Sequence, residues 1–533
     1  MKYIYTLKIL FALCLFGIIL LYSTKTMAQT EYLPYSFQLS DKLSKDMYSP
    51  STDLHTSIKP YIITDSSSLR PAYNAIMNRG VDSNRKGLVI RKLFNEHLLE
   101  VKTADYSFYF DYLPDLLLGR EFNQKTNTSL NTRGYQAGGT VGSNIYFYTS
   151  GFENQAQYPT YLNQYVRESG MVPGQAYDFD AGIGSKDWSY VTSIVGYSPS
   201  KSVNIEAGID KTFIGDGYRS MLLSDFASNY PMIRLKVDLG KKVRYLFMWA
   251  YMQDQTAPKL DSLPHAPNRI KWGVFHYIDW SITNRASLGF FNAMIAPGNY
   301  DNATSHGFDV NYVNPILFLK SAAPSGPIPD NTLIGFNAKY KVLDKTIVYS
   351  QFIYDQLASN GNSKDGFQLG LRGADLLSVN SFNYLLEFNT SKPYNTTTQY
   401  SLVNYTDLNE PLAHPFGPNF KELVGILSYS IGKFDFRGEV DYAKYYLDLA
   451  TLYEGNDVLF PDLTTQYSNT STAVNTNFKY AQGTVSYLIN PKYNLRIEAG
   501  ATYRDEQNSQ YSSKTMLINF GLRSTFRDLY TDF

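Results

Sequence analysis

The C-terminal part of the chain alternates strictly between apolar and polar side chains. Successive side chains of a β-strand point to opposite sides, so a strand over 493–504 would have one face suited to hydrocarbon and one suited to water. The first face carries Tyr493, Leu495, Ile497, Ala499, Ala501 and Tyr503, and the second carries Asn494, Arg496, Glu498, Gly500, Thr502 and Arg504. An apolar band of about ten residues with an aromatic residue at each end is typical of strands in outer-membrane β-barrels.

The same alternation recurs in four other segments, at 233–239, 334–342, 434–442 and 516–523. Their apolar faces carry Ile233, Leu235, Val237 and Leu239; Ile334, Phe336, Ala338, Tyr340 and Val342; Phe434, Phe436, Val440 and Tyr442; and Met516, Ile518, Phe520 and Leu522. The segment 272–282 fits less well, because His276 would share the lipid face with Trp272 and Val274. A local bulge or a misplaced strand boundary would explain this exception.

Short and long connections alternate between these segments. Periplasmic turns of outer-membrane barrels are short and outer loops are long, so short links should fall at every second connection. Short links occur at 198–202, 240–242, 283–285, 344–345, 375–380, 432–433 and 490–492, and longer ones at 152–187, 214–231, 253–271, 297–332, 356–366, 390–421, 447–477 and 505–513. The sequence therefore predicts an all-β fold, a transmembrane antiparallel outer-membrane β-barrel of about 16–18 strands.

The N-terminal residues have the pattern of a secretory signal peptide. Lys2 and Lys8 precede the apolar run 9–22, and Thr26-Met27-Ala28 offers a cleavage site. An uncleaved anchor is the alternative, but the run is short for a span of about 20 residues. We predict a signal peptide at 1–28, a periplasmic or plug segment with a short helix at 29–90, and the barrel at 91–533. The last residue, Phe533, resembles the terminal aromatic residue that barrel-assembly machinery reads.

Composition narrows the classes of function. Without residues 1–28 the chain would carry 45 basic and 48 acidic residues and no cysteine, because the only one is Cys14. No basic stripe suggests a nucleic-acid partner, and the six histidines lack metal-ligand spacing. Ser220, Asp225 and His414 could form a triad, but no GxSxG motif surrounds the serine. We therefore expect no enzyme activity, no metal and no cofactor.

The loop 214–231 is a candidate binding element. Gly215 and Gly217 permit a sharp turn that would bring Asp216, Tyr218 and Arg219 to one side. A flat aromatic ring beside planar hydrogen-bonding groups suits carbohydrate recognition. Alternatively, the loop folds inward and Arg219 pairs with a lumenal acid to close the barrel.

Two blocks of sequence carry a family resemblance. Gly215-Asp216-Gly217-Tyr218-Arg219-Ser220, followed by Leu222-Leu223-Ser224-Asp225, resembles the signature of RemB-type gliding-motility proteins, which belong with Wzi-like capsule-assembly barrels. The segment 411–422, which reads PLAHPFGPNFKE, is similar to a second block of that family. The chain departs from the family pattern at 392–396, which puts any ligand contact of that stretch in doubt.

The resemblance implies a non-enzymatic outer-membrane barrel of about 18 strands. It implies a role in binding or displaying extracellular or capsular polysaccharide, for gliding motility, adhesion or capsule attachment, with outer-membrane lipid and gliding or export machinery as further partners. The candidate ligand-binding residues are Asp216, Tyr218, Arg219, Asp225, His414 and Asn419. A porin or solute channel is the alternative, because the predicted lumen carries charges of both signs.

Overall fold

The computed structural model describes residues 30–52, 54–65, 67–179, 184–261, 266–299, 328, 330–355, 364–393, 395–398, 400–448, 456–459 and 474–533. The predicted signal peptide lies outside these residues. No helix among the described residues is both long enough and apolar enough to cross a bilayer.

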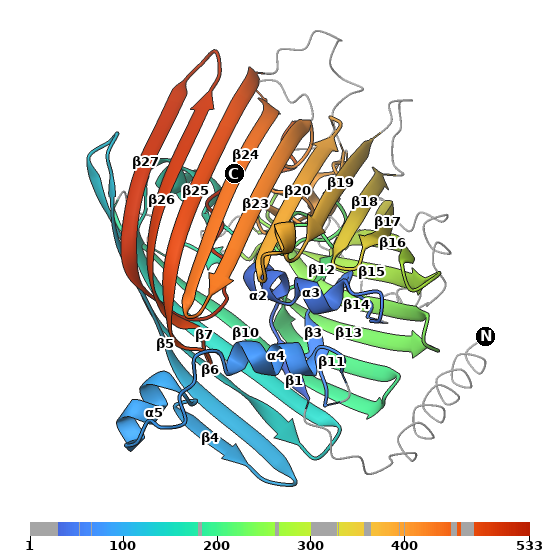
Figure 1. The fold of residues 1–533 in the computed structure, drawn as a ribbon. Coiled ribbons are helices and arrows are strands. Elements are labelled where there is room, and N and C mark those ends of the chain that lie inside the picture. The colour runs from blue at the N-terminus through green and yellow to red at the C-terminus, as the bar shows by residue number, and fades with distance from the viewer. Residues whose placement is uncertain are drawn as a thin grey trace, which may run out of the picture.

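Eighteen strands among the described residues form one closed antiparallel barrel (Figure 1), as the alternating pattern predicted. Each strand pairs with its neighbour in chain order, and the last strand pairs with the first. The strands are β5 (Tyr106–Glu121), β6 (Thr126–Val141), β7 (Ile145–Gln157), β10 (Lys186–Ser200), β11 (Val203–Asp210), β13 (Tyr230–Leu239), β14 (Val243–Asp254), β15 (Arg269–Ser281), β16 (Ala286–Pro297), β17 (Asn331–Leu343), β18 (Thr346–Asp355), β19 (Asp365–Gly373), β20 (Phe382–Ser391), β23 (Phe420–Ile431), β24 (Phe434–Leu447), β25 (Val474–Asn490), β26 (Leu495–Gln507) and β27 (Ser512–Arg523).

The outward and inward faces follow the sequence alternation. On β24, Phe434, Val440 and Tyr442 are exposed on the outside, whereas Glu439 and Asp441 are buried on the inside. The same division holds on β13, β17 and β27. On β26 the outward residues are Ile497, Ala499, Ala501 and Tyr503, and Leu495 departs from the pattern because it is buried. Hydrocarbon therefore covers the outside of the barrel, and charged groups fill its inside.

His276 lies on the outward face of β15, so neither a bulge nor a shifted boundary is needed. Its Nδ1 atom is 2.7 Å from the hydroxyl of Tyr245 on the neighbouring strand β14. The ring of Phe247 packs against it at 5.1 Å between centroids. The hydrogen bond to Tyr245 and the packing of the Phe247 ring reduce the cost of placing a polar imidazole on the lipid-facing side.

All seven predicted short links are turns at one end of the barrel, which is the periplasmic end by the rule of short turns. The predicted link at 505–513 is shorter than expected, because β26 and β27 remain paired beyond the apolar band and leave only 508–511 unpaired. Several long connections lie partly outside the described residues.

The N-terminal segment packs against the lumenal wall. Its β1 (Glu31–Leu33) pairs with β3 (Tyr61–Ile63), and two short helices, α2 (Phe37–Lys42) and α3 (Ser44–Met47), lie between these strands in the sequence. Ser36 caps α2 by accepting a hydrogen bond from the backbone N–H of Leu39 at 3.4 Å. The segment continues through β2 (Ile58–Lys59), α4 (Arg70–Met77), α5 (Leu88–Phe94) and β4 (Leu99–Lys102).

Short elements in the long connections narrow the other end of the lumen. The connection after β7 contains α6 (Thr160–Ser169), β8 (Met171–Val172) and β9 (Ala176–Tyr177), and the connection after β11 contains β12 (Phe213–Ile214). The connection after β20 contains η3 (Ser401–Val403), β21 (Thr406–Asp407) and β22 (Glu410–Pro411), and η2 (Leu376–Ser378) lies in a periplasmic turn.

The C-terminus requires a correction. The last strand ends at Arg523, and residues 524–533, here called the C-terminal tail, turn back into the lumen. The ring of Phe533 contacts Tyr165 of α6 at 4.8 Å and Phe226 at 5.5 Å between centroids. The sequence had suggested that Phe533 is a terminal aromatic residue of the kind that ends a membrane strand. In the structure it does not end a strand, because its aromatic partners lie inside the barrel.

Candidate functional site

The loop 211–229 folds into the lumen and forms the centre of a buried network. Its strand β12 pairs with β2 of the N-terminal segment. The backbone N–H groups of Tyr218 and Arg219 donate to the carboxylate of Glu387 at 2.9 and 3.0 Å. A Cβ atom at Gly217 would lie 2.2 Å from that carboxylate. The glycine of the GDGYRS motif therefore allows the backbone to approach the wall of β20.

Asp216 is enclosed by the N-terminal segment and the wall. It accepts hydrogen bonds from Thr56 at 2.5 Å and from Tyr48 at 3.4 Å, and the ammonium group of Lys339 lies 3.3 Å away. Burial alone would raise the pKa of Asp216, but Lys339 and Lys59 outweigh it and hold that pKa below its usual value. A charged carboxylate thus fastens the loop to β17.

Arg219 joins the loop to the C-terminal tail. Its guanidinium lies 3.0 Å from Asp532 and 3.3 Å from Glu422 on β23. The hydroxyl of Tyr218 donates to the same Asp532 carboxylate at 2.6 Å. This geometry corresponds to the alternative in which the loop folds inward and Arg219 pairs with lumenal acids.

His414 approaches the same cluster from the connection 392–419. Its Nδ1 accepts the backbone N–H of Phe416 at 3.2 Å, so Nε2 carries the proton and donates to Glu422 at 2.7 Å. Burial lowers the pKa of His414 despite the neighbouring Glu422 carboxylate. The ring is therefore neutral and ties the connection 392–419 to Glu422, the acid that Arg219 also contacts.

Asp225 and Asn419 lie apart from this cluster. Asp225 is buried beside Lys211, which donates to its backbone carbonyl at 2.7 Å, and burial raises the pKa of the Asp225 carboxyl. Asn419 adopts a left-handed backbone conformation (φ 54°) where the connection enters β23, a conformation that asparagine accepts readily. Its backbone N–H donates to the carbonyl of Lys392 at 3.1 Å.

The structure thus brings four of the six candidates together and buries most of them. Three acids that complete the network, Glu387, Glu422 and Asp532, were absent from the sequence-based set. Glu422 ends the PLAHPFGPNFKE block, so that block was a usable signal. Nothing in the sequence marks Asp532, because Tyr218 and Arg219, which contact it, lie more than three hundred positions away.

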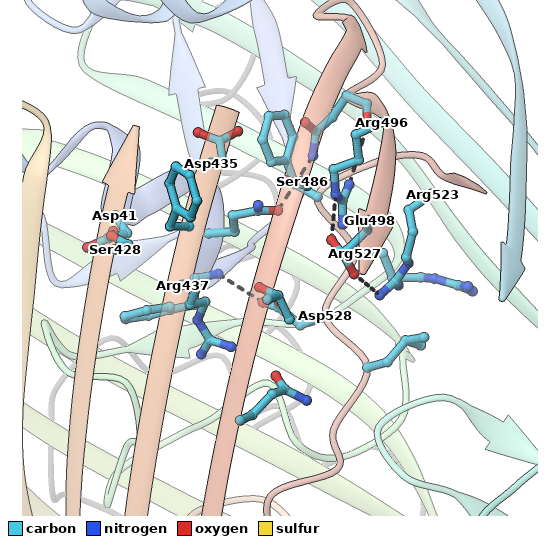
Figure 2. A pocket seen from close by; sticks show the side chains of 18 of the residues that line it. Asp41, Ser428, Asp435, Arg437, Ser486, Arg496, Glu498, Arg523, Arg527 and Asp528 are labelled. Carbon is cyan, nitrogen blue, oxygen red and sulfur yellow. Dashed lines mark hydrogen bonds and ion pairs between the residues drawn. The ribbon is translucent and has the colours of Figure 1, made fainter. Parts of the chain in front are cut away.

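A cavity of about 600 Å³ remains between the wall and the C-terminal tail. Figure 2 shows Arg496, Arg523 and Arg527 around Glu498. The carboxylate of Glu498 lies 2.8 Å from Arg496 and 3.2 Å from Arg523. Among the described residues, no group of three His, Cys, Asp or Glu side chains has the arrangement of a metal site. This geometry supports an ion-paired lumen.

Comparison with family models gives no match, and no curated protein matches the sequence. Solved structures do match. Wzi from Escherichia coli, an outer-membrane protein involved in group 1 capsule assembly and described as a carbohydrate-binding β-barrel, aligns with a TM-score of 0.53 and 13% identity, over 92% of this chain and 98% of Wzi. OprD from Pseudomonas aeruginosa aligns with a TM-score of 0.41 and 11% identity, over 78% of this chain and 95% of OprD.

The match to Wzi shows a shared fold. The closed antiparallel barrel, its outward apolar band and this fold together place the chain in the outer membrane.

Proposed function

We propose that this protein is a non-enzymatic outer-membrane surface protein that binds or displays extracellular polysaccharide, in gliding motility, adhesion or capsule attachment. The observation that supports this most is the filling of the lumen. The N-terminal segment, two inward connections and the C-terminal tail meet inside the barrel around buried ion pairs. A barrel filled in this way is suited to presenting an outer surface. The resemblance of two sequence blocks to RemB-type and Wzi-like proteins supports the same role.

A group of amides and a tyrosine at the outer end offers a surface for sugars. Asn268 donates to the hydroxyl of Tyr177 and, at 3.2 Å, to the side-chain carbonyl of Gln253. Asn409 donates to Gln255 at 3.3 Å. These side chains come from three different connections and are partly exposed. Planar amides that both donate and accept, next to an aromatic ring, match the hydroxyl groups and flat faces of sugars.

In this proposal three of the six sequence-based candidates support the surface from below. Asp216, Arg219 and His414 fasten the connections that carry Tyr218, Asn409 and Asn419. Loss of a fastening residue would therefore weaken glycan binding through disorder of the connections.

A deletion strain provides the test. We expect it to retain less surface polysaccharide or to spread less on agar, and the wild-type gene to restore both. The double variant Tyr177→Ala/Asn268→Ala should fail to restore them although it is present in the outer membrane. Lys241→Ala, in the periplasmic turn after β13, is the matched control and should restore both. Unchanged polysaccharide and spreading in the deletion strain would refute the proposal.

The cavity of about 600 Å³ favours a second candidate, a solute channel. Planar-bilayer recording separates the two, because the buried network predicts almost no current. Steady conductance comparable to that of an open porin of similar strand number would favour the channel.

A further inference from the structure

The barrel closes through a short contact between its last and first strands, here called the seam. β27 pairs with β5 over six residues, from Leu517 opposite Glu121 to Leu522 opposite Leu116. The next pair, β5 and β6, is matched over sixteen residues. β5 begins at Tyr106, so its residues 106–114 extend past the end of β27 at Arg523. The edge of this part of β5 is not paired with β27, so its backbone groups need another partner.

β4 is that partner over part of the edge. It pairs antiparallel with 107–110, which places Leu99 opposite Phe110 and Val101 opposite Phe108. Residues directly opposite each other in an antiparallel pair share a face. Tyr112, two residues after Phe110, is exposed on the outside of the barrel. Leu99 and Val101 are thus exposed on the same side as the lipid-facing band.

The helix α5 precedes β4 and has no buried residue. Leu88 is 66% exposed and Val89 is 76% exposed, and Ile90 and Leu93 are exposed as well. Figure 1 draws α5 and β4 beside the lower ends of β5 and β6, apart from α2 and α3. Soluble surfaces rarely leave such a group of large aliphatic side chains uncovered.

Hydrogen bonds fix the level of this segment at the periplasmic end of the barrel. Asn490, the last residue of β25, donates to the carbonyls of Lys92 and Glu96 at 3.0 Å each. Asp111 of β5 accepts the backbone N–H of Leu98 at 2.9 Å. Asn490 lies at the start of a short periplasmic turn. The helix α5 therefore lies beside the barrel wall at the periplasmic interface of the outer membrane.

The excess of basic side chains in this segment also suits a position beside the phosphates of the membrane interface. Residues 85–102 contain five Lys or Arg and two Asp or Glu. Arg91 and Lys92 lie on α5 itself, next to its aliphatic side chains. Aliphatic residues that enter a bilayer beside long cationic side chains that reach the phosphates are typical of interfacial helices.

We propose that residues 85–102 form an interfacial flap, which inserts the aliphatic side chains of α5 and β4 into the periplasm-facing leaflet and covers the edge of β5 below the seam. Phospholipid is the occupant because β4 continues a sheet face that lipid already covers. The proposal rests on the barrel fold and is independent of the polysaccharide role.

Single-cysteine labelling tests the flap. In a Cys14→Ser background of the full chain, Val89→Cys is labelled with an environment-sensitive fluorophore and reconstituted into vesicles of phosphatidylethanolamine and phosphatidylglycerol. Doxyl-labelled lipids are then added as quenchers. Val440→Cys, on the outward face of β24, is the lipid-exposed control, and Ser509→Cys, in the exposed turn before β27, is the water-exposed control.

We expect quenching at position 89 to be within about twofold of that at position 440, with shallow doxyl groups quenching more than deep ones. Quenching as weak as at position 509 would overturn the proposal and indicate a periplasmic protein or water at this surface. Leu93→Cys gives a second probe if Val89→Cys does not assemble. Quenching at position 440 in the same vesicles shows that the barrel itself is inserted.

Discussion

At the scale of single residues, Glu410 joins three connections of the lumen. Its carboxylate accepts the backbone N–H of Gly174 at 2.7 Å and the hydroxyl of Ser228 at 2.8 Å. Burial raises the pKa of Glu410 to about 7, although both hydrogen bonds oppose that rise. A carboxyl group with a raised pKa in the folded state stabilises the fold most below its unfolded pKa, and that contribution is lost as the pH rises through the folded value.

Glu410→Gln should therefore flatten the pH dependence of stability. The wild type is expected to lose up to about 3 kcal/mol between pH 4.5 and 7 through this group, whereas a neutral amide loses nothing there. Urea unfolding of the detergent-solubilised barrel at several pH values measures the difference. Glu168→Gln, on the exposed side of α6, is the control, and equal slopes for wild type and Glu410→Gln would contradict the assignment.

Gly217 shows how one residue permits a whole contact. Gly217→Ala would place a Cβ atom 2.2 Å from the Glu387 carboxylate and 2.8 Å from the carbonyl of Arg219. We expect destabilisation of about 1–3 kcal/mol, visible as a lower midpoint in urea. Gly438→Ala is a matched control because nothing lies within 4 Å of its added Cβ. Equal midpoints for the two variants would show that the loop does not need the glycine.

At the scale of elements, β24 tests the assignment of faces. Val440 is 59% exposed on the outside, and Glu439 is buried on the inside 2.7 Å from Arg437. Val440→Arg should cost about 2–4 kcal/mol if it meets lipid near the midplane, and Glu439→Gln should cost less. Heat-modifiable migration on gels reports assembly, and equal tolerance of both changes would mean that this assignment of faces is wrong.

The C-terminal tail is the element that divides the lumen. Arg527, Asp528 and Tyr530 line both the cavity of about 600 Å³ and a second cavity of about 420 Å³. Deletion of residues 524–533 should join the two and raise bilayer conductance above that of the wild type. Phe533→Ala, which removes one ring and keeps the partition, should conduct like the wild type. An assembled deletion variant with unchanged current would show that the loops alone seal the barrel.

At the scale of the whole molecule, the alternation of side chains was sufficient to predict the barrel, its strand faces and the seven short turns. These features depend on contacts between residues and solvent, and such contacts leave a period of two in the sequence. The candidate site was less predictable. Arg219 and His414 were identified from their sequence blocks, but their shared partner Glu422 was not, and the inward course of the Arg219 loop was only one of two alternatives.

The sequence by itself therefore determined that this chain separates hydrocarbon from water as a closed cylinder, because local periodicity carries that information. Only the tertiary structure decided what fills the cylinder. The inward course of the loop at 211–229, the return of Phe533 into the lumen and the partnership of Arg219 with Asp532 depend on residues that are distant in the chain. These ion pairs and ring contacts join residues that are far apart in the chain, so no local pattern of residues records them.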